Sequence, residues 1–85
     1  MKSFEYTVTD PIGIHARPAG MLMKFAKQFS SKITLSKDDR TVDVTRLMSL
    51  MAMSVRNGDT VTVTAEGDDE DTAIEEMRRF FAENL

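Results

Sequence analysis

The segment PIGIHARPAG, residues 11–20, contains the side chains of this chain that are best suited to chemistry. His15 is the only histidine, and Arg17 and Pro18 follow it after one alanine. An imidazole nitrogen can act as a nucleophile, and a guanidinium offers five N–H donors in a planar fork that fits phosphate oxygens. This spacing therefore points to chemistry on a phosphoryl group.

The same segment lies where a helix is expected to begin, which adds backbone donors. If His15 is the N-cap residue, the N–H groups of Ala16 and Arg17 have no acceptor in the helix, and the positive end of the helix dipole lies beside the ring. Pro18 suits a first turn because it has no N–H to leave unpaired. Phosphoryl transfer needs mainly positioning and charge stabilisation, and these groups supply both without a metal.

Two other kinds of site do not fit the residues, and one structural role does. A zinc site needs three or four ligands, but the chain has one histidine and no cysteine, so no metal or other cofactor is expected. A hydrolytic nucleophile needs a separate base, and no second histidine exists. From these residues alone, phosphoryl transfer and an ordinary role for His15 as a helix cap or surface residue both stay open.

The composition predicts one small domain over residues 1–85, because 85 residues with 41% apolar content can build one core but not two. The lack of cysteine, of a leader-like N-terminus and of a long apolar run predicts a cytoplasmic protein without membrane insertion. A net charge of −3 argues against nucleic acid as a partner. The segment EGDDEDTAIEE holds seven of the 14 acids, whereas the region around His15 is locally basic.

Alternation of apolar and polar residues predicts four strands, over residues 2–9, 32–36, 40–44 and 60–66. Helices are expected from residue 16 to about 29, over roughly 46–53 and over the C-terminal segment. The turn signals are KDDR, which predicts a hairpin, and the Asn-Gly pair of RNGD. This order of elements predicts an α+β two-layer sandwich with helices covering one face of the sheet.

The helix ends carry their own signals. Thr45 is the expected N-cap of the second helix, and Asp68 or Asp69 that of the last one. Arg78 and Arg79 near the end of the last helix would complement its dipole. The apolar stripe expected on that helix comprises Ala73, Ile74, Met77, Phe80 and Phe81.

The motif GIHARPA, the methionine-rich second helix, the Asn-Gly turn and TVTVTAEGDDE together resemble the HPr family, the histidine-containing phosphocarriers of the bacterial sugar phosphotransferase system. The resemblance covers the whole chain. It implies an open-faced β-sandwich, with a four-stranded antiparallel sheet and three helices on one face. It also implies that enzyme I phosphorylates His15 on Nδ1 with a group taken from phosphoenolpyruvate, and that His15 passes the group to IIA domains of sugar permeases.

The resemblance further implies a monomeric, stoichiometric carrier rather than an enzyme, with Arg17 beside the phosphohistidine. Methionine adapts to differently shaped partners, and a short helix cannot bury every side chain. The positions that match the partner-binding residues of the family are Leu47, Met48 and Met51, bordered by Arg17, Gly20 and Lys24. Leu50 and Met53 are expected in the core.

Two positions depart from the usual family pattern. Arg46 stands where many relatives have a regulatory serine, so control by a serine kinase is not expected, and the hydroxyls of Thr45 and Ser49 are not assigned that role. Gly20 replaces the usual alanine. Gly13 is interpreted as slack that lets the loop present the ring.

Two alternative functions remain. In the first, the chain is an HPr-like regulatory module that acts on partner proteins. In the second, it is a carrier in a nitrogen-linked or dihydroxyacetone-linked phosphorelay.

Overall fold

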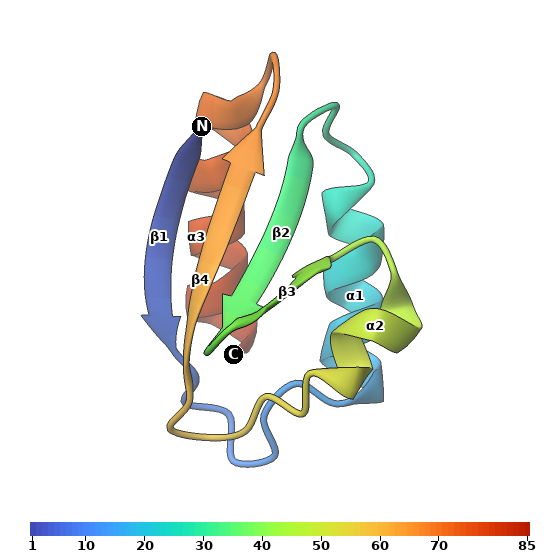
Figure 1. The fold of residues 1–85 in the computed structure, drawn as a ribbon, viewed down its shortest axis with the longest axis vertical. Coiled ribbons are helices and arrows are strands. Elements are labelled where there is room, and N and C mark those ends of the chain that lie inside the picture. Colours follow the sequence, from blue (N-terminus) through green and yellow to red (C-terminus); the bar gives the residue numbers. More distant parts are fainter.

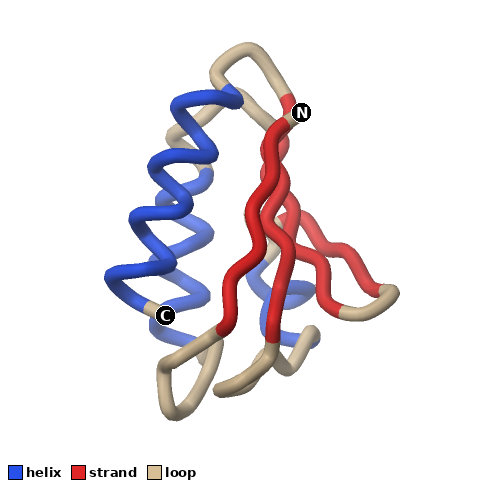
Figure 2. Tube along the Cα trace, turned by 90° about the vertical axis from the view of Figure 1, so that its left-hand side faces the viewer, coloured by secondary structure: helices blue, strands red, loops and turns tan.

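Four antiparallel strands form one sheet, and two long helices cover one of its faces (Figure 1). The computed structural model describes residues 1–85, with the elements β1 (Lys2–Thr7), α1 (Ala16–Ala26), β2 (Lys32–Lys37), β3 (Arg40–Asp43), α2 (Leu47–Ala52), β4 (Thr60–Glu66) and α3 (Glu70–Asn84). The strand order is β1-β4-β2-β3, and every neighbouring pair is antiparallel. Figure 2 shows α1 and α3 as a layer on one side of the sheet, and the short α2 contacts α1 and β3. The predicted open-faced sandwich is confirmed.

The core lies between the sheet and the helical layer. Val61 and Val63 of β4 are buried, whereas Thr62 and Thr64, which alternate with them, are only partly covered, as the period of two predicts. Phe81 of α3 packs edge-on against Phe4 and Tyr6 of β1, with ring centroids 5.7 and 5.5 Å away. The whole predicted stripe of α3 is buried: Ala73, Ile74, Met77, Phe80 and Phe81. This packing fixes α3 against the sheet.

Helix α1 ends at Ala26, three residues before its predicted end at about Phe29. The N–H groups of Gln28 and Phe29 donate to the carbonyls three residues earlier, on Phe25 and Ala26, so the chain tightens into turns. Phe29 still packs on Phe25, with ring centroids 5.5 Å apart. The apolar periodicity of the sequence therefore extends to Phe29, which is packed although it lies beyond the end of α1.

The predicted N-cap of α2 is wrong, because Arg46 occupies that position. The backbone N–H and the hydroxyl of Thr45 instead donate to Oδ1 of Asp43, at 2.9 and 2.6 Å. Short polar side chains commonly make such local bonds in place of a cap. The helix spans six residues, one fewer at each end than predicted.

Asp69 stands at the predicted N-cap of α3, but its carboxylate does not cap the helix. It accepts hydrogen bonds from the hydroxyl and the N–H of Ser31 and from the N–H of Ser30. These bonds, that of the Ser31 hydroxyl foremost, hold the pKa of Asp69 below its usual value. Asp69 thus fastens the turn after α1 to the start of α3.

The predicted arginines near the end of α3 do not lie in its last turn, because the helix continues to Asn84. Arg78 lies over the ring of Phe4, 5.0 Å from its centroid, and Arg79 pairs with Glu76 at 3.7 Å. They therefore do not complement the dipole at the helix end.

Candidate functional site

His15 is the N-cap residue of α1, as predicted. Its backbone is extended, with φ −112° and ψ −172°, and its carbonyl accepts the first helical hydrogen bond from Ala19 at 2.9 Å. Its side chain makes no capping bond to the helix and is half-buried. The N–H groups of Ala16 and Arg17 have no acceptor within the helix. The ring and these two donors are therefore available to a ligand.

The loop before His15 is held together by Asp10. One carboxylate oxygen of Asp10, Oδ1, accepts hydrogen bonds from the N–H groups of Ile12 and Gly13, at 2.8 and 3.2 Å. The N–H of Gly13 also lies 3.0 Å from the carbonyl oxygen of Asp10. Aspartate commonly closes turns by accepting from the backbone two residues on. His15 is thus presented by a turn with internal bonds.

Gly13 is not slack in this loop, and that interpretation was wrong. Its φ is +84°, and a Cβ built there would lie 2.3 Å from the carbonyl oxygen of Val55 and 2.7 Å from Cα of Arg56. The next residue, Ile14, donates its N–H to the same carbonyl at 3.0 Å. Glycine is required because the loop passes directly against a second backbone segment.

That second segment, residues 55–59, is itself fastened at both ends. Oδ2 of Asp59 accepts from the N–H of Arg56 at 2.9 Å and pairs with Nζ of Lys37 at 3.0 Å. The hydrogen bond from Arg56, followed by that from Lys37, holds the pKa of Asp59 below its usual value. Asn57 donates its side-chain amide to the carbonyl of Thr9 at 3.0 Å. The loop behind His15 is therefore supported from the sheet.

The end of α3 meets the same loop from the other side. The carbonyl oxygen of Leu85 accepts from the N–H groups of Thr9 and Asp10, at 2.6 and 2.8 Å, and from the Thr9 hydroxyl at 3.1 Å. Leu85 is buried. This anchor brings Asn84 opposite the start of α1, where its side-chain N–H donates to the carbonyl of Phe80 at 3.0 Å.

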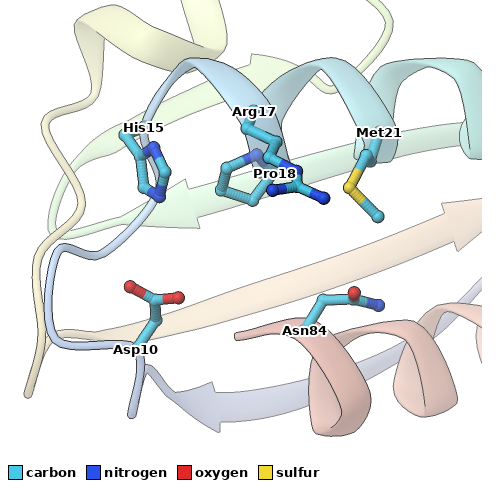
Figure 3. Close-up of a pocket in the computed structure, with 6 residues that line it drawn as sticks. All are labelled: Asp10, His15, Arg17, Pro18, Met21 and Asn84. Atoms are coloured by element: carbon cyan, nitrogen blue, oxygen red, sulfur yellow. The ribbon is translucent and has the colours of Figure 1, made fainter.

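A cleft of about 270 Å³ opens between the start of α1, the loop and the end of α3 (Figure 3). Its lining residues are Asp10, His15, Arg17, Pro18, Met21 and Asn84. Figure 3 shows the carboxylate of Asp10 pointing toward the imidazole ring. The structure thus brings His15 and Arg17 to one cleft, as predicted. It also places one acidic residue, Asp10, in the same cleft.

Sequence reasoning missed three of the lining residues, namely Asp10, Met21 and Asn84. Met21 lies four positions after Arg17 on α1, so helical spacing alone could have placed it on the same face. Asp10 directly follows the strand predicted over residues 2–9, and nothing local to Asp10 or Asn84 signals its position in the cleft. Both depend on the contact between Leu85 and the loop, which joins distant parts of the chain.

The predicted partner-binding residues lie on the neighbouring helices α1 and α2 (Figure 1). The side chain of Met48 is 79% exposed and that of Met51 37%, whereas Leu47 is half-buried against the core. Lys24 is exposed and Gly20 is partly covered. Both residues predicted for the core, Leu50 and Met53, are buried. We call Gly20, Lys24, Leu47, Met48 and Met51 the docking patch.

The site combines a nucleophilic ring, two backbone donors and a guanidinium, which suits a phosphoryl group. No cluster of three or more His, Cys, Asp or Glu side chains is placed to hold a metal ion. None of the helices has the length and apolar character needed to cross a membrane.

Comparison with known proteins gives the family. A family model described as "PTS HPr component phosphorylation site" matches residues 2–83. Phosphocarrier protein HPr of Mycoplasma capricolum subsp. capricolum is 38% identical over 79 residues, which cover 93% of this chain and 89% of the relative. A solved histidine-containing phosphocarrier protein of Mycoplasma matches with a TM-score of 0.92 at 35% identity, covering 96% of this chain and 93% of that one. A solved HPr dimer from Thermoanaerobacter tengcongensis matches with a TM-score of 0.77 at 35% identity, covering 98% and 95%. The chain therefore belongs to the HPr family, the phosphocarriers of the bacterial phosphotransferase system.

Proposed function

We propose that His15 accepts a phosphoryl group from phospho-enzyme I, which takes it from phosphoenolpyruvate, and passes it to IIA domains of sugar permeases. The observation that supports this most is the placement of His15, whose ring makes no capping bond and opens on a cleft beside Arg17. In the loading step, the Nδ1 lone pair of His15 attacks phosphorus as the bond to the donor breaks. The second transfer reverses this at the acceptor, so the chain returns unchanged as a stoichiometric carrier.

Arg17 and the start of α1 hold the transferred group. The N–H groups of Ala16 and Arg17 donate to its oxygens, and the guanidinium neutralises part of its charge. Such contacts are worth most in the transition state, where charge spreads over three oxygens. No metal or other cofactor takes part in this proposal.

The docking patch binds enzyme I and the IIA domains in turn. The exposed thioethers of Met48 and Met51 offer a flexible apolar surface, and the ammonium of Lys24 adds a positive charge at its border. One surface that serves a donor and several acceptors needs this adaptability. The patch lies beside the cleft, so docking on it brings a partner's reactive group to His15.

Our proposal does not include the serine-kinase control known in many relatives, because Arg46 has no hydroxyl for such a kinase to phosphorylate. We also propose that residues 1–85 act as a single HPr domain, in the cytoplasm and as a monomer. Because a similar protein has been solved as a dimer, sedimentation of the purified chain is the direct check of the last point.

The relay can be tested with purified components. The chain, enzyme I, Mg²⁺ and phosphoenolpyruvate are mixed with a glucose-type IIA domain, and each protein is followed by intact mass. We expect the IIA domain to gain one phosphoryl group only when both enzyme I and this chain are present. Equal labelling of the IIA domain with the His15→Ala variant would refute the proposal.

A further inference from the structure

Asp10 is the one acidic side chain that lines the cleft around His15, and the proposed transfer does not use it. Its carboxylate points toward the imidazole ring (Figure 3). Arg17 is the only lysine or arginine among the residues that line this cleft. The ring of His15 therefore shares the cleft with groups of opposite charge.

The two charges differ in how firmly they are held. Asp10 is fixed by its N–H bond to Leu85 at 2.8 Å and by the bonds that its Oδ1 accepts from Ile12 and Gly13 at 2.8 and 3.2 Å. Arg17 is exposed on the first turn of α1 and forms no ion pair with an acid. The positive group can follow a ligand, whereas the negative group stays beside the ring.

We propose that the fixed charge of Asp10 promotes release of the phosphoryl group from His15. The inference rests on the proposed phosphorylation of His15, and it assigns Asp10 a role that opposes that of Arg17. A phosphoryl group brings a charge of about −1.5 to −2, which Asp10 repels. When the group leaves, the N–P bond breaks, its electron pair returns to the ring nitrogen, and the repulsion between the group and the carboxylate is relieved.

This repulsion acts on the loaded form of His15. It raises the free energy of the loaded form relative to the unloaded one, in which the ring carries no phosphoryl charge. Phosphorus forms its new bond to a nitrogen of the acceptor, or to the oxygen of water, which gives inorganic phosphate. A carrier has to give up its cargo, and Asp10 keeps Arg17 and the helix start from holding it too tightly.

The size of the effect follows from one unit charge near the ring in a cleft open to water. Such a charge changes the balance between two charge states by about threefold to tenfold. Asp10→Asn tests it cleanly because an asparagine oxygen can still accept from Ile12 and Gly13 while the charge is gone. The matched control is Asp71→Asn, which removes an equal charge at the opposite end of α3, about 20 Å away.

The test loads His15 chemically with phosphoramidate, a small phosphoryl donor, so that neither enzyme I nor a IIA domain is needed. Hydrolysis of the phosphohistidine is followed by ³¹P NMR in the wild type, Asp10→Asn and Asp71→Asn. We expect the half-life to lengthen about threefold to tenfold in Asp10→Asn and to stay at the wild-type value in Asp71→Asn. An unchanged or shorter half-life in Asp10→Asn overturns the proposal.

A merely structural role for Asp10 is separated by hydrogen exchange. Protection of the Gly13 amide should be the same in Asp10→Asn as in the wild type, because the acceptor is retained. If Asp10→Asn does not fold, Asp10→Ser supplies a second uncharged side chain that can accept from the loop. Failure of the relay with enzyme I would leave this chemical assay intact, so the two proposals fail separately.

Discussion

Among the glycines of the site and of α1, Gly13 should be the one whose replacement by alanine most disturbs the loop that supports His15. The new Cβ would lie 2.3 Å from the carbonyl oxygen of Val55 and 2.7 Å from Cα of Arg56, both backbone atoms. Neither can rotate away as a side chain would. The loop, or residues 55–56, must shift.

The magnitude has two parts. A residue with a Cβ at φ +84° costs about 1–2 kcal/mol relative to glycine. Overpacking against fixed backbone adds about 1–3 kcal/mol. The total of about 2–5 kcal/mol corresponds to a fall in Tm of about 8–40 °C for a domain of this size.

Thermal and urea unfolding followed by circular dichroism measure this loss, and two other glycines separate its causes. Gly58 also has a positive φ, +91°, but a Cβ there meets nothing within 4 Å, so Gly58→Ala should cost only the strain of about 1–2 kcal/mol. At Gly20, inside α1, a Cβ again meets nothing within 4 Å, and alanine should stabilise by about 0.5–1 kcal/mol. If Gly13→Ala were no less stable than Gly58→Ala, the close approach to Val55 would not constrain the loop.

Three further predictions concern the cleft, the docking patch and the fold. Arg17→Ala should slow phosphoryl transfer by about tenfold or more while changing the unfolding free energy by less than about 0.5 kcal/mol, and a large loss of stability with normal transfer would contradict its role. Met48→Glu should weaken binding of enzyme I by about tenfold in calorimetry, because it buries an unpaired charge, whereas Ser3→Glu on the open face of the sheet should not. The pKa of Asp69 is lowered in the folded state, so the unfolded chain binds the proton more readily and the stabilisation present above about pH 4 is lost as the pH falls. Asp69→Asn should therefore be less stable at neutral pH and lose less stability between about pH 5 and pH 2 in urea titrations, and an acid dependence equal to that of the wild type would remove Asp69 as its source.

The sequence predicted the elements of the fold because their signals are local. The alternation of valine and threonine in TVTVTAE corresponds to β4, and the apolar stripe of the last helix is buried in full. Helix ends were predicted less well, because they depend on competing bonds. Thr45 bonds to Asp43 instead of capping α2, and Asp69 bonds across to Ser31 instead of capping α3.

In the candidate site too, the sequence predicted what depends on local signals and missed what depends on distant contacts. His15 and Arg17 are two positions apart in the sequence and share one helix start, so their spacing sufficed to bring them together. Asp10 joins them only because a turn folds back and Leu85 anchors it from the far end of the chain. The tight position of Gly13 likewise depends on Val55, which is distant in the sequence. Contacts of this kind leave no periodic or compositional trace.

The central claim is that His15 itself carries the phosphoryl group. The most direct measurement is the intact mass of the chain after incubation with enzyme I, Mg²⁺ and phosphoenolpyruvate, followed by acid treatment and by ³¹P NMR of the adduct. We expect one acid-labile phosphoryl group per chain, with the chemical shift of an Nδ1-phosphohistidine, and none in His15→Ala. An acid-stable adduct, or an adduct that persists in His15→Ala, would contradict the account.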